Sequence, residues 1–412
     1  MNYSTTVQFL YGLQQHGIKL GLDNIRTLLR RVGDPQQRFP IVHVGGTNGK
    51  GSTSAMVAAI AEAAGYRVGL YTSPHLIDFR ERMRVNGVMI PEERVTGLVE
   101  QLQAAAAPEF APTFFEFTTA LAFSYFAEMQ VDLAVVEVGL GGRFDATNVV
   151  CPIATAITTI GLDHEPYLGS TLQAIAFEKV GIGKPGIPLV LGRIEEPALA
   201  VIERRADELG IPLFRLGREF RTEGQAPADF SYEGPGGRYA HLNCRLHGHF
   251  QLDNAACALA LCGLLNARGF RLPEAALRNG LQSVSWEGRL EVVAASPTVL
   301  VDGAHNPAAA QVLAEYLAAW RKARPTRRLC LILGMMRDKQ PQAFLEPLRP
   351  LLDVLVVTQC DFPRATPAVD LRTALRDLVP SAQLAATPAD ALELARRQIE
   401  PDDLICVTGS LM

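Results

Sequence analysis

A glycine-rich stretch with one lysine, HVGGTNGKGST at residues 43–53, has the residue types of a loop that binds nucleotide phosphates. The backbone N–H groups of its glycines can converge on phosphate oxygens, and Lys50 places a positive charge beside them. A glycine turn that only caps a helix would not explain this lysine. Ser52 or Thr53 can face magnesium with its hydroxyl. Gly51 separates Lys50 from these hydroxyls, whereas the common motif has the hydroxyl directly after the lysine.

A second group of polar residues lies in YTSPHLIDFRERMRVNG at residues 71–87. Its side chains include a hydroxyl, a histidine, a carboxylate and three arginines: Ser73, His75, Glu81, Arg80, Arg82 and Arg84. Such a segment can bind anions or present a hydroxyl to a metal. A solvated charged loop fits the same composition.

Glu137 interrupts an apolar strand-like run at the start of EVGLGGRFDATN. A carboxylate in a buried strand is costly unless it is paired or bound to a metal. Magnesium accepts one or two carboxylates together with phosphate oxygens and water. We therefore predict that Glu137 binds magnesium near Lys50, with an ion pair to Arg143 as the structural alternative.

A third cluster, Asp163, His164 and Glu165, directly follows another apolar run. A histidine between two carboxylates at the end of a strand makes a second divalent metal site plausible. Lys179 lies further along, near the end of a predicted helix, where it can simply pair with Glu178. A partly buried lysine can also react with carbon dioxide to give a carbamate that serves as an anionic metal ligand.

The second half of the chain carries a similar pattern in VLVDGAHNP. Asp302 ends a strand-like run, and His305 and Asn306 lead into the next helix, where Asn306 is a natural N-cap. Asp302 can also bind a ribose or base while Arg289 reaches the phosphates from the other side. Asn254 similarly fits either a helix cap or an adenine contact.

Strand-like and helical segments alternate along most of the chain, which indicates parallel sheets covered by helices. The expected strands of the first half are Ile41–Val44, Arg67–Tyr71, Leu133–Val138, Ile153–Thr158 and Pro188–Leu191, and a helix is expected at residues 52–64. Further helices are expected near residues 252–267 and 273–282. The fold class is therefore α/β with two domains. We expect an N-terminal parallel-sheet P-loop ATPase domain at residues 1–290, with a hairpin region near 217–250, and a smaller Rossmann-like α/β domain at 291–412.

The composition favours small-molecule chemistry. The 412 residues are 48% hydrophobic and 20% charged, with a formal net charge of -4, so no electrostatic footprint for nucleic acid or an anionic membrane is present. The seven cysteines show no paired C-x-x-C spacing and are expected to be reduced. Without a basic segment followed by an apolar one at the N-terminus, we expect a cytoplasmic protein.

Seven strings occur in one order along nearly the whole chain: GTNGKGST, TSPHL, EVGLGGRFDATN, EKVGI, GHFQLDNAACAL, WEGRLE and DGAHNP. This set resembles the folylpolyglutamate and dihydrofolate synthases among the Mur-ligase-like ATP-dependent amide ligases. The resemblance implies ATP contacts at Thr47, Asn48, Gly49, Lys50, Gly51, Ser52, Asn254, Arg289, Asp302 and His305. It implies two magnesium sites with ligands Ser73, Glu137 and His164, catalytic roles for Lys50, His164 and Lys179, and carbamylation of Lys179. It also implies a pterin pocket of Thr113, Phe114, Phe115, Glu116, Phe144, Asp145 and Ala146, although the phenylalanines alone fit a helix core.

The implied reaction passes the γ-phosphoryl group of ATP to a carboxylate of dihydropteroate or of a reduced folate, and the amine of L-glutamate then attacks the acyl phosphate. A monomer is the expectation from the family. The competing hypotheses are a monofunctional folylpolyglutamate synthase, a Mur-type cell-wall ligase, and a P-loop NTPase without ligase activity.

Overall fold

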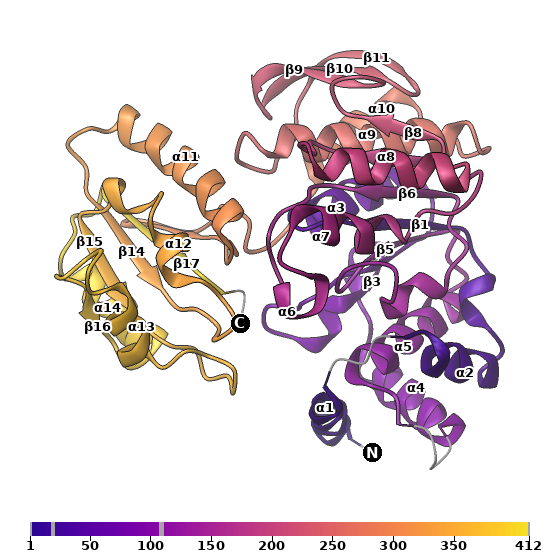
Figure 1. Cartoon of the computed structure of the whole chain (residues 1–412), viewed down its shortest axis with the longest axis horizontal. Coiled ribbons are helices and arrows are strands. Elements are labelled where there is room, and N and C mark those ends of the chain that lie inside the picture. The colour runs from indigo at the N-terminus through magenta and orange to yellow at the C-terminus, as the bar shows by residue number, and fades with distance from the viewer. Residues whose placement is uncertain (1, 18–20, 107–110, 411–412) are drawn as a thin grey trace. The chain divides into compact units, whose positions relative to one another are not determined.

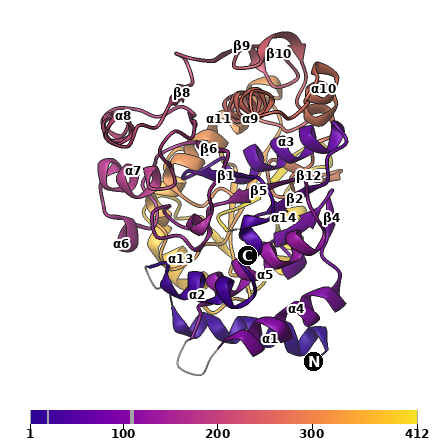
Figure 2. The same ribbon diagram turned by 90° about the vertical axis from the view of Figure 1, so that its right-hand side faces the viewer.

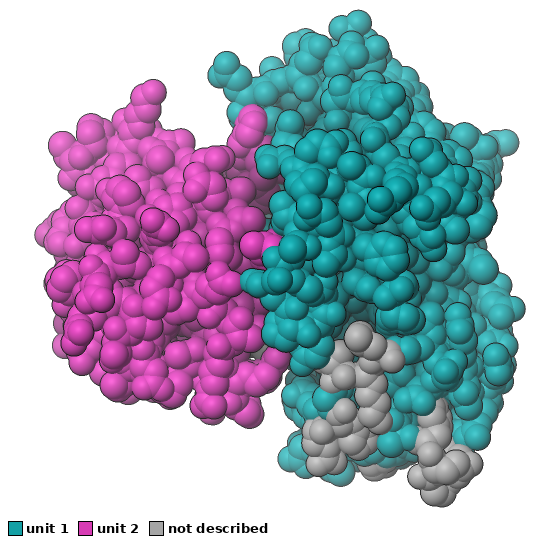
Figure 3. Space-filling model, viewed as in Figure 1, with its two compact units in different colours: residues 1–161, 165–245, 251–285 teal, residues 162–164, 246–250, 286–412 magenta. Residues whose placement is uncertain are grey.

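The structure is a computed structural model that describes residues 2–17, 21–106 and 111–410. The chain forms two compact units (Figure 3). The first comprises residues 1–161, 165–245 and 251–285, and the second comprises residues 162–164, 246–250 and 286–412. All seven cysteines are unpaired, and Cys151 is exposed. No helix within the described ranges is long and apolar enough to cross a membrane.

An eight-stranded sheet forms the centre of the first unit, in the order β4-β3-β2-β5-β1-β6-β7-β8 (Figure 1). The strands are β1 (Ile41–Gly45), β2 (Val68–Tyr71), β3 (Met83–Val85), β4 (Val88–Met89), β5 (Leu133–Glu137), β6 (Ala154–Ile157), β7 (Leu189–Leu191) and β8 (Leu213–Arg215). Strands β2, β5, β1, β6, β7 and β8 are parallel, and β3 and β4 extend one edge in antiparallel pairing. The five strands predicted from the first half of the sequence are confirmed.

Helices cover both faces of this sheet (Figures 1 and 2). One face packs on α1 (Tyr3–Gly12), α2 (Asp23–Arg31), α4 (Glu92–Ala105) and α5 (Phe114–Glu128). The other face packs on α3 (Lys50–Ala63), which contacts α9 (Gln251–Asn266) and α10 (Glu274–Ser283). Helices α7 (Leu172–Val180) and α8 (Ala198–Leu209) contact each other and form a core with β6 and β7, and α6 spans Glu165–Leu168. Alternate strand residues face opposite sides, so both helical layers bury apolar strand side chains.

The turn-rich segment after β8 forms a small antiparallel sheet in the order β11-β10-β9 that packs on α9. Its strands are β9 (Arg221–Ala226), β10 (Asp229–Gly234) and β11 (Gly237–Leu242). Short 3-10 helices occur at η1 (Leu13–His16), η2 (Pro35–Gln37), η3 (Phe79–Arg82), η4 (Ala146–Val149) and η5 (Arg349–Leu351).

The second unit contains a six-stranded sheet in the order β12-β13-β17-β14-β15-β16. The strands are β12 (Glu291–Ala295), β13 (Thr298–Val301), β14 (Leu329–Leu333), β15 (Val354–Val357), β16 (Gln383–Leu384) and β17 (Leu404–Thr408), and only β12 pairs antiparallel. The helices are α11 (Pro307–Ala323), α12 (Pro341–Leu345), α13 (Ala368–Leu375) and α14 (Pro388–Arg396). Along β14, Leu329, Leu331 and Leu333 pack with α11, α12 and α13, whereas Cys330 and Ile332 pack with α14. Alternation along one strand thus supplies two separate cores.

Candidate functional site

The predicted phosphate loop lies between β1 and α3. Helix α3 begins at Lys50, two residues before the predicted start, because Gly49 adopts a φ of 87° and turns the chain directly into the helix. Lys50, Gly51 and Ser52 therefore lie in the first helical turn, where backbone N–H groups have no partner within the helix. This is the geometry in which a helix N-terminus binds an anion. The Lys50 Nζ donates to the carbonyl oxygen of Thr47 at 2.9 Å.

The loop is held by the segment that follows β6. The Thr47 backbone N–H donates to the Thr159 carbonyl at 2.8 Å, and the Asn48 N–H donates to the Thr159 hydroxyl at 2.9 Å. The Thr47 hydroxyl donates to the Gly161 carbonyl at 3.2 Å. These bonds fix the loop backbone without using the N–H groups at the start of α3.

Gly46 permits the closest approach in this loop. It has a φ of 140°, and a Cβ added there would lie 2.0 Å from the Thr158 Oγ1. We expect Gly46→Ala to lower the free energy of unfolding by about 3 kcal/mol or more. The matched control is Gly65→Ala, because Gly65 also has a positive φ, of 91°, but open space around the added atom. The control should lose only about 1 kcal/mol in urea unfolding, and equal losses would contradict the packing argument.

Two side chains from distant parts of the sequence contact the phosphate loop. A Cβ on Gly49 would lie 2.3 Å from the Asn254 Oδ1, so Asn254 lies directly against the loop. Asn254 is not the cap of α9, because that helix begins at Gln251, to whose side chain the Asn254 Nδ2 donates at 2.8 Å. Gln251 in turn contacts the Ser52 hydroxyl at 3.4 Å. The sequence allowed Asn254 to be either a helix cap or an adenine contact, and the helix cap is wrong.

Lys179 is the second such side chain. It is only 5% exposed, and its Nζ donates to the Gly46 carbonyl at 2.8 Å. Glu178 pairs with Arg143 at 2.7 Å, and no ion pair joins it to Lys179 among the bridges of the described chain. The predicted alternative, a helix lysine that pairs with Glu178, is therefore wrong. Lys179 is a buried amine beside the phosphate loop.

Ser73 and Glu137 are also brought together. Glu137 is 5% exposed, lies opposite Val44 in the pairing of β5 with β1, and accepts the Ser73 backbone N–H at 3.1 Å. The alternative ion pair with Arg143 is wrong, because the Arg143 guanidinium binds Glu178.

The donors at this position, a carboxylate and a hydroxyl, are oxygen ligands of the kind that hard divalent cations accept. Among the described residues, no three or more His, Cys, Asp or Glu side chains gather into a metal-binding group. One carboxylate and one hydroxyl suit magnesium, which takes its remaining ligands from phosphate oxygens and water. The third predicted ligand, His164, belongs to the second unit, where its backbone has a φ of 52°.

The residues predicted to form a pterin pocket differ in their burial and in their contacts. Thr113 and Glu116 form a capping box at the start of α5, in which the Thr113 N–H donates to Glu116 at 2.7 Å and the Glu116 N–H donates back at 3.2 Å. Phe115 packs on Gly139, where an added Cβ would lie 2.3 Å from its ring. Phe144 is 38% exposed. The Thr113 and Glu116 side chains are buried, and the capping box accounts for their hydrogen bonds to each other.

Asp145 caps the short helix η4. Its carboxylate accepts the N–H groups of Leu140 at 2.8 Å and Thr147 at 3.0 Å, and it also accepts the Thr147 hydroxyl. Burial raises the pKa of Asp145, and these hydrogen bonds oppose that shift. The adjacent Ala146 is buried.

His43 on β1 is fully buried beside this group and contacts the Thr147 hydroxyl at 2.8 Å. Burial, together with the positive charge of Lys184, lowers the pKa of His43 to about 3. An unfolded histidine titrates near about 6.5, so between these values the unfolded chain binds the extra proton. Stability therefore falls as the pH drops from about 6.5 toward 3, by about 1.4 kcal/mol per pH unit from this residue.

We expect His43→Gln to flatten the dependence of the free energy of unfolding on pH in that window. Urea unfolding at several pH values measures the slope. The exposed His241, 86% exposed at its side chain, supplies the control His241→Gln, which should keep the wild-type slope. Equal slopes for His43→Gln and the wild-type protein would contradict the assignment.

In the second unit, Asp302 directly follows β13 and is buried. It accepts the N–H groups of Leu290 at 3.0 Å and Ala304 at 2.9 Å. Burial raises the pKa of Asp302, and the positive charge of Arg289 opposes that shift. Arg289 and Asp302 therefore lie close enough to interact electrostatically.

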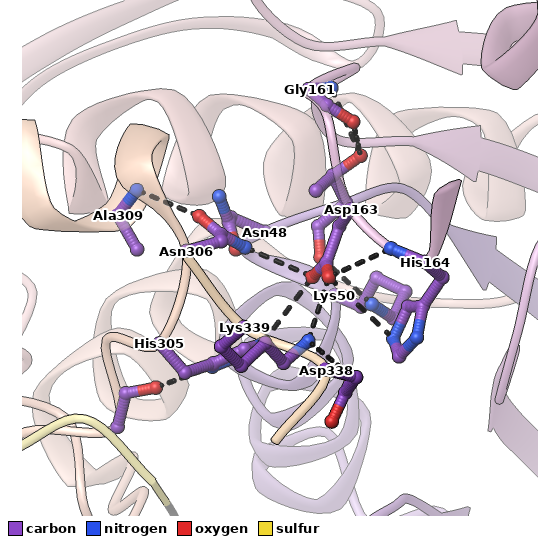
Figure 4. A network of polar contacts seen from close by, with 12 residues as sticks. Asn48, Lys50, Gly161, Asp163, His164, His305, Asn306, Ala309, Asp338 and Lys339 are labelled. Carbon is purple, nitrogen blue, oxygen red and sulfur yellow. Dashed lines mark hydrogen bonds and ion pairs between the residues drawn. The ribbon is translucent and has the colours of Figure 1, made fainter. Parts of the chain in front are cut away.

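Asp163 is the centre of a polar network in the second unit (Figure 4). Its carboxylate binds the Lys339 Nζ at 2.7 Å, the Asn306 Nδ2 at 3.0 Å and the His305 Nε2 at 3.4 Å. Burial alone would raise the pKa of Asp163, but the hydrogen bond from His305 and the charges of His164 and Lys339 hold it well below its usual range. Asp163 is therefore a carboxylate anchored by these three side chains, and it directly precedes His164 in the chain.

The sequence predicted part of this network. Asn306 is the N-cap of α11 and accepts the Ala309 N–H at 2.9 Å, so the predicted cap is confirmed. Lys339 was missed, because its surroundings, RDKQ, have no distinctive spacing. Its side chain is only 9% exposed, and burial of a lysine cannot be read from a local sequence.

Comparisons with known proteins agree with this geometry. Residues 44–262 match the Mur ligase middle domain, and residues 288–411 match the glutamate ligase domain of Mur ligases. The chain is therefore a member of the Mur ligase family.

Its relatives define the branch of that family. The chain is 37% identical to dihydrofolate synthase/folylpolyglutamate synthase of Bacillus subtilis over 99% of this chain and 96% of the relative. The Escherichia coli enzyme of the same name is 34% identical over 98% and 92%. The chain belongs to the dihydrofolate synthase/folylpolyglutamate synthase family.

Solved structures of relatives share the fold. Escherichia coli FolC in complex with DHPP and ADP matches with a TM-score of 0.90 at 33% identity, covering 100% of this chain and 95% of that one. The bifunctional enzyme of Yersinia pestis, complexed with AMPPNP and a manganese ion, matches with a TM-score of 0.89 at 32% identity, over 100% and 96%. The predicted α/β fold with two parallel-sheet domains is confirmed.

Proposed function

We propose that this protein is an ATP-dependent ligase that adds L-glutamate to dihydropteroate, forming dihydrofolate, and to tetrahydrofolate, forming folylpolyglutamates. The observation that carries the proposal is the convergence of Lys179 and Asn254 on the glycine loop at the start of α3. A phosphate loop alone would fit many nucleotide-binding proteins. A buried amine and an amide held against it fit the ligase family to which the chain belongs.

In the proposed reaction, a carboxylate oxygen of the pteroyl substrate attacks the γ-phosphorus of ATP, and ADP leaves. Lys50 and the N-terminus of α3 bind the phosphates and neutralise the charge that develops on them. The glutamate amine then attacks the acyl carbon, loses a proton, and expels phosphate to leave an amide. No side chain needs to act as a nucleophile, so positioning and electrostatics carry the catalysis.

The remaining predicted residues have proposed binding roles. The ATP contacts are Thr47, Asn48, Gly49, Lys50, Gly51, Ser52, Asn254, Arg289, Asp302 and His305. Ser73, Glu137 and His164 would hold magnesium, which supplies positive charge next to the phosphates when bound. The pterin-bearing substrate would contact Thr113, Phe114, Phe115, Glu116, Phe144, Asp145 and Ala146.

We further propose that Lys179 is carbamylated. Its burial and its contact with the loop support this, because a desolvated amine favours the neutral form that reacts with carbon dioxide. The carbamate would add an anionic oxygen ligand close to the phosphates. We also propose a cytoplasmic monomer.

The function is tested with purified protein, ATP, magnesium and glutamate, using dihydropteroate and tetrahydrofolate in separate reactions and weighing the products by mass spectrometry. A mass increase of one glutamyl residue on both substrates is expected. Product from tetrahydrofolate alone would establish the monofunctional alternative. Turnover of a UDP-muramyl substrate, or ATP hydrolysis that ignores pteroyl substrates and glutamate, would overturn the proposal in favour of a cell-wall ligase or a simple NTPase.

A further inference from the structure

Arg82 is a buried cation to which none of the proposed steps assigns a role. It ends η3, is only 5% exposed, and its carbonyl accepts the Thr72 N–H at 3.1 Å. Arg80, two residues earlier in the same segment, differs from Arg82 in its pairing. Arg80 is paired with Asp78 at 2.6 Å and with Glu92 at 3.6 Å, so its charge is already neutralised.

Within the part of the chain that the structure describes, the Arg82 guanidinium has no carboxylate bonded to it in this way. Among the described residues, no carboxylate lies within ion-pair distance of Arg82, and its one hydrogen bond runs from Nε to the His75 Nδ1 at 2.8 Å. The Nη1 and Nη2 groups, which form the planar fork of the guanidinium, make none. Burying a charge without a directly bonded opposite charge is unfavourable, and the carboxylates of Glu137 and Glu81 act on Arg82 only from beyond ion-pair distance, so the fork can accept the carboxylate of a ligand.

The surroundings of Arg82 are aromatic. The guanidinium carbon lies 5.3 Å from the centre of the Phe114 ring, and Phe114 packs against Phe79 and Tyr11 at 6.3 and 6.1 Å. Tyr11 is 39% exposed, so this aromatic group reaches the protein surface. A flat aromatic ligand carrying a carboxylate matches an aromatic wall that ends in a guanidinium fork.

His75 holds the guanidinium in place. Because Arg82 donates to its Nδ1, the other nitrogen, Nε2, carries the proton and donates to the Tyr11 hydroxyl at 3.1 Å.

The backbone around Arg82 is also fixed. The Glu81 carboxylate accepts three successive N–H groups, from Leu76 at 2.7 Å, Ile77 at 2.9 Å and Asp78 at 2.7 Å. The fork is therefore preorganised, which lowers the entropic cost of binding.

We propose that the Arg82 guanidinium is a binding site for a carboxylate of the pteroyl substrate. The inference rests on the proposed function. Two carboxylates share this chemistry: the benzoate group of dihydropteroate, and the glutamyl carboxylates of tetrahydrofolate. Phe114, on the aromatic wall, is one of the residues proposed to contact the pterin-bearing substrate, so Arg82 would extend that pocket toward its acidic end.

The test compares binding of dihydropteroate with binding of its decarboxylated analogue, in which aniline replaces the aminobenzoate. Fluorescence titration without nucleotide or glutamate gives the dissociation constants for the wild-type protein and for Arg82→Met. We expect removal of the ligand carboxylate to weaken wild-type binding on the order of 10- to 100-fold. Arg82→Met should lose the same factor for dihydropteroate and nothing more for the analogue.

Tetrahydrofolate identifies which carboxylate binds. Weaker binding of dihydropteroate to Arg82→Met assigns the benzoate group, and weaker binding of tetrahydrofolate alone assigns a glutamyl carboxylate. Unchanged binding of both compounds overturns the proposal, as does equal discrimination against the analogue by variant and wild type. Arg80→Met, two residues away, is the matched control and should bind as the wild type does.

Arg82→Lys keeps the charge but loses the fork, so it decides the question if Arg82→Met does not fold. An intermediate loss of affinity is expected, and wild-type affinity would overturn the proposal. If the wild-type protein makes glutamyl products but Arg82→Lys and Arg82→Met bind both pteroyl compounds as the wild type does, only the Arg82 site is excluded. The proposed function is then unaffected. A wild-type protein that binds neither pteroyl compound would remove both.

Discussion

Lys50→Ala is expected to lower kcat for glutamate ligation roughly 10³-fold or more, the scale found when one charge-stabilising group is removed from a phosphoryl-transfer site. Lys50 is the first residue of α3, and its ammonium reaches back to the Thr47 carbonyl at 2.9 Å. It therefore lies over the loop where the phosphates are proposed to bind. Loss of this charge affects the transferred phosphoryl group more than the bound ground state.

The measurement is steady-state kinetics of product formation with both pteroyl substrates, together with thermal unfolding. Only one hydrogen bond to the loop is lost, so the variant should unfold close to the wild-type temperature. Lys322→Ala, in the last turn of α11, is the control for removal of a positive charge and should retain activity. Wild-type turnover by Lys50→Ala would remove this lysine from the mechanism.

The second large effect is expected for Lys179→Ala, which should lower kcat on the order of 10²-fold or more because an anionic ligand near the phosphates is lost. Lys179 is buried and donates to the Gly46 carbonyl, so its removal leaves a small cavity beside the loop. A short carboxylic acid such as acetate can enter that space and replace the carbamate oxygens. Partial recovery of activity with added acetate is therefore the specific expectation.

Two controls separate carbamylation from a structural role. Acetate should not raise the activity of the wild-type protein or of Lys50→Ala. Carbon-13 bicarbonate should give a carbamate signal in the NMR spectrum of the wild-type protein that is missing from Lys179→Ala. Full activity of Lys179→Ala without acetate, or a spectrum that does not differ between the two proteins, would exclude the carbamate.

Local sequence patterns predicted the features that depend on local physics. The alternation of apolar runs with helical segments located β1, β2, β5, β6 and β7, because strand and helix periodicities are properties of short segments. Asn306 was identified as a cap for the same reason. The start of α3 was placed two residues late, because the chain turns into the helix at Gly49, whose φ is positive, and a local apolar pattern does not report that backbone conformation.

Pairings between distant residues were beyond the sequence. Arg143 was weighed as a partner for Glu137 because the two are close in sequence, but the approach of α7 gives it Glu178 instead. Asp163 and Lys339 are separated by 176 positions and form a nearly buried ion pair. Arg82 was one of three arginines in a charged segment, and only the fold shows that it is buried with no described carboxylate at ion-pair distance.

The central claim, ligation through an acyl phosphate, is tested most directly by following one oxygen atom. Dihydropteroate labelled with oxygen-18 in its carboxylate is incubated with the protein, ATP, magnesium and glutamate, and the released phosphate is weighed. The carboxylate oxygen that attacks the γ-phosphorus leaves with phosphate when the amide forms. We predict one oxygen-18 atom in the phosphate for each dihydrofolate formed, and unlabelled phosphate alongside labelled product would contradict the account.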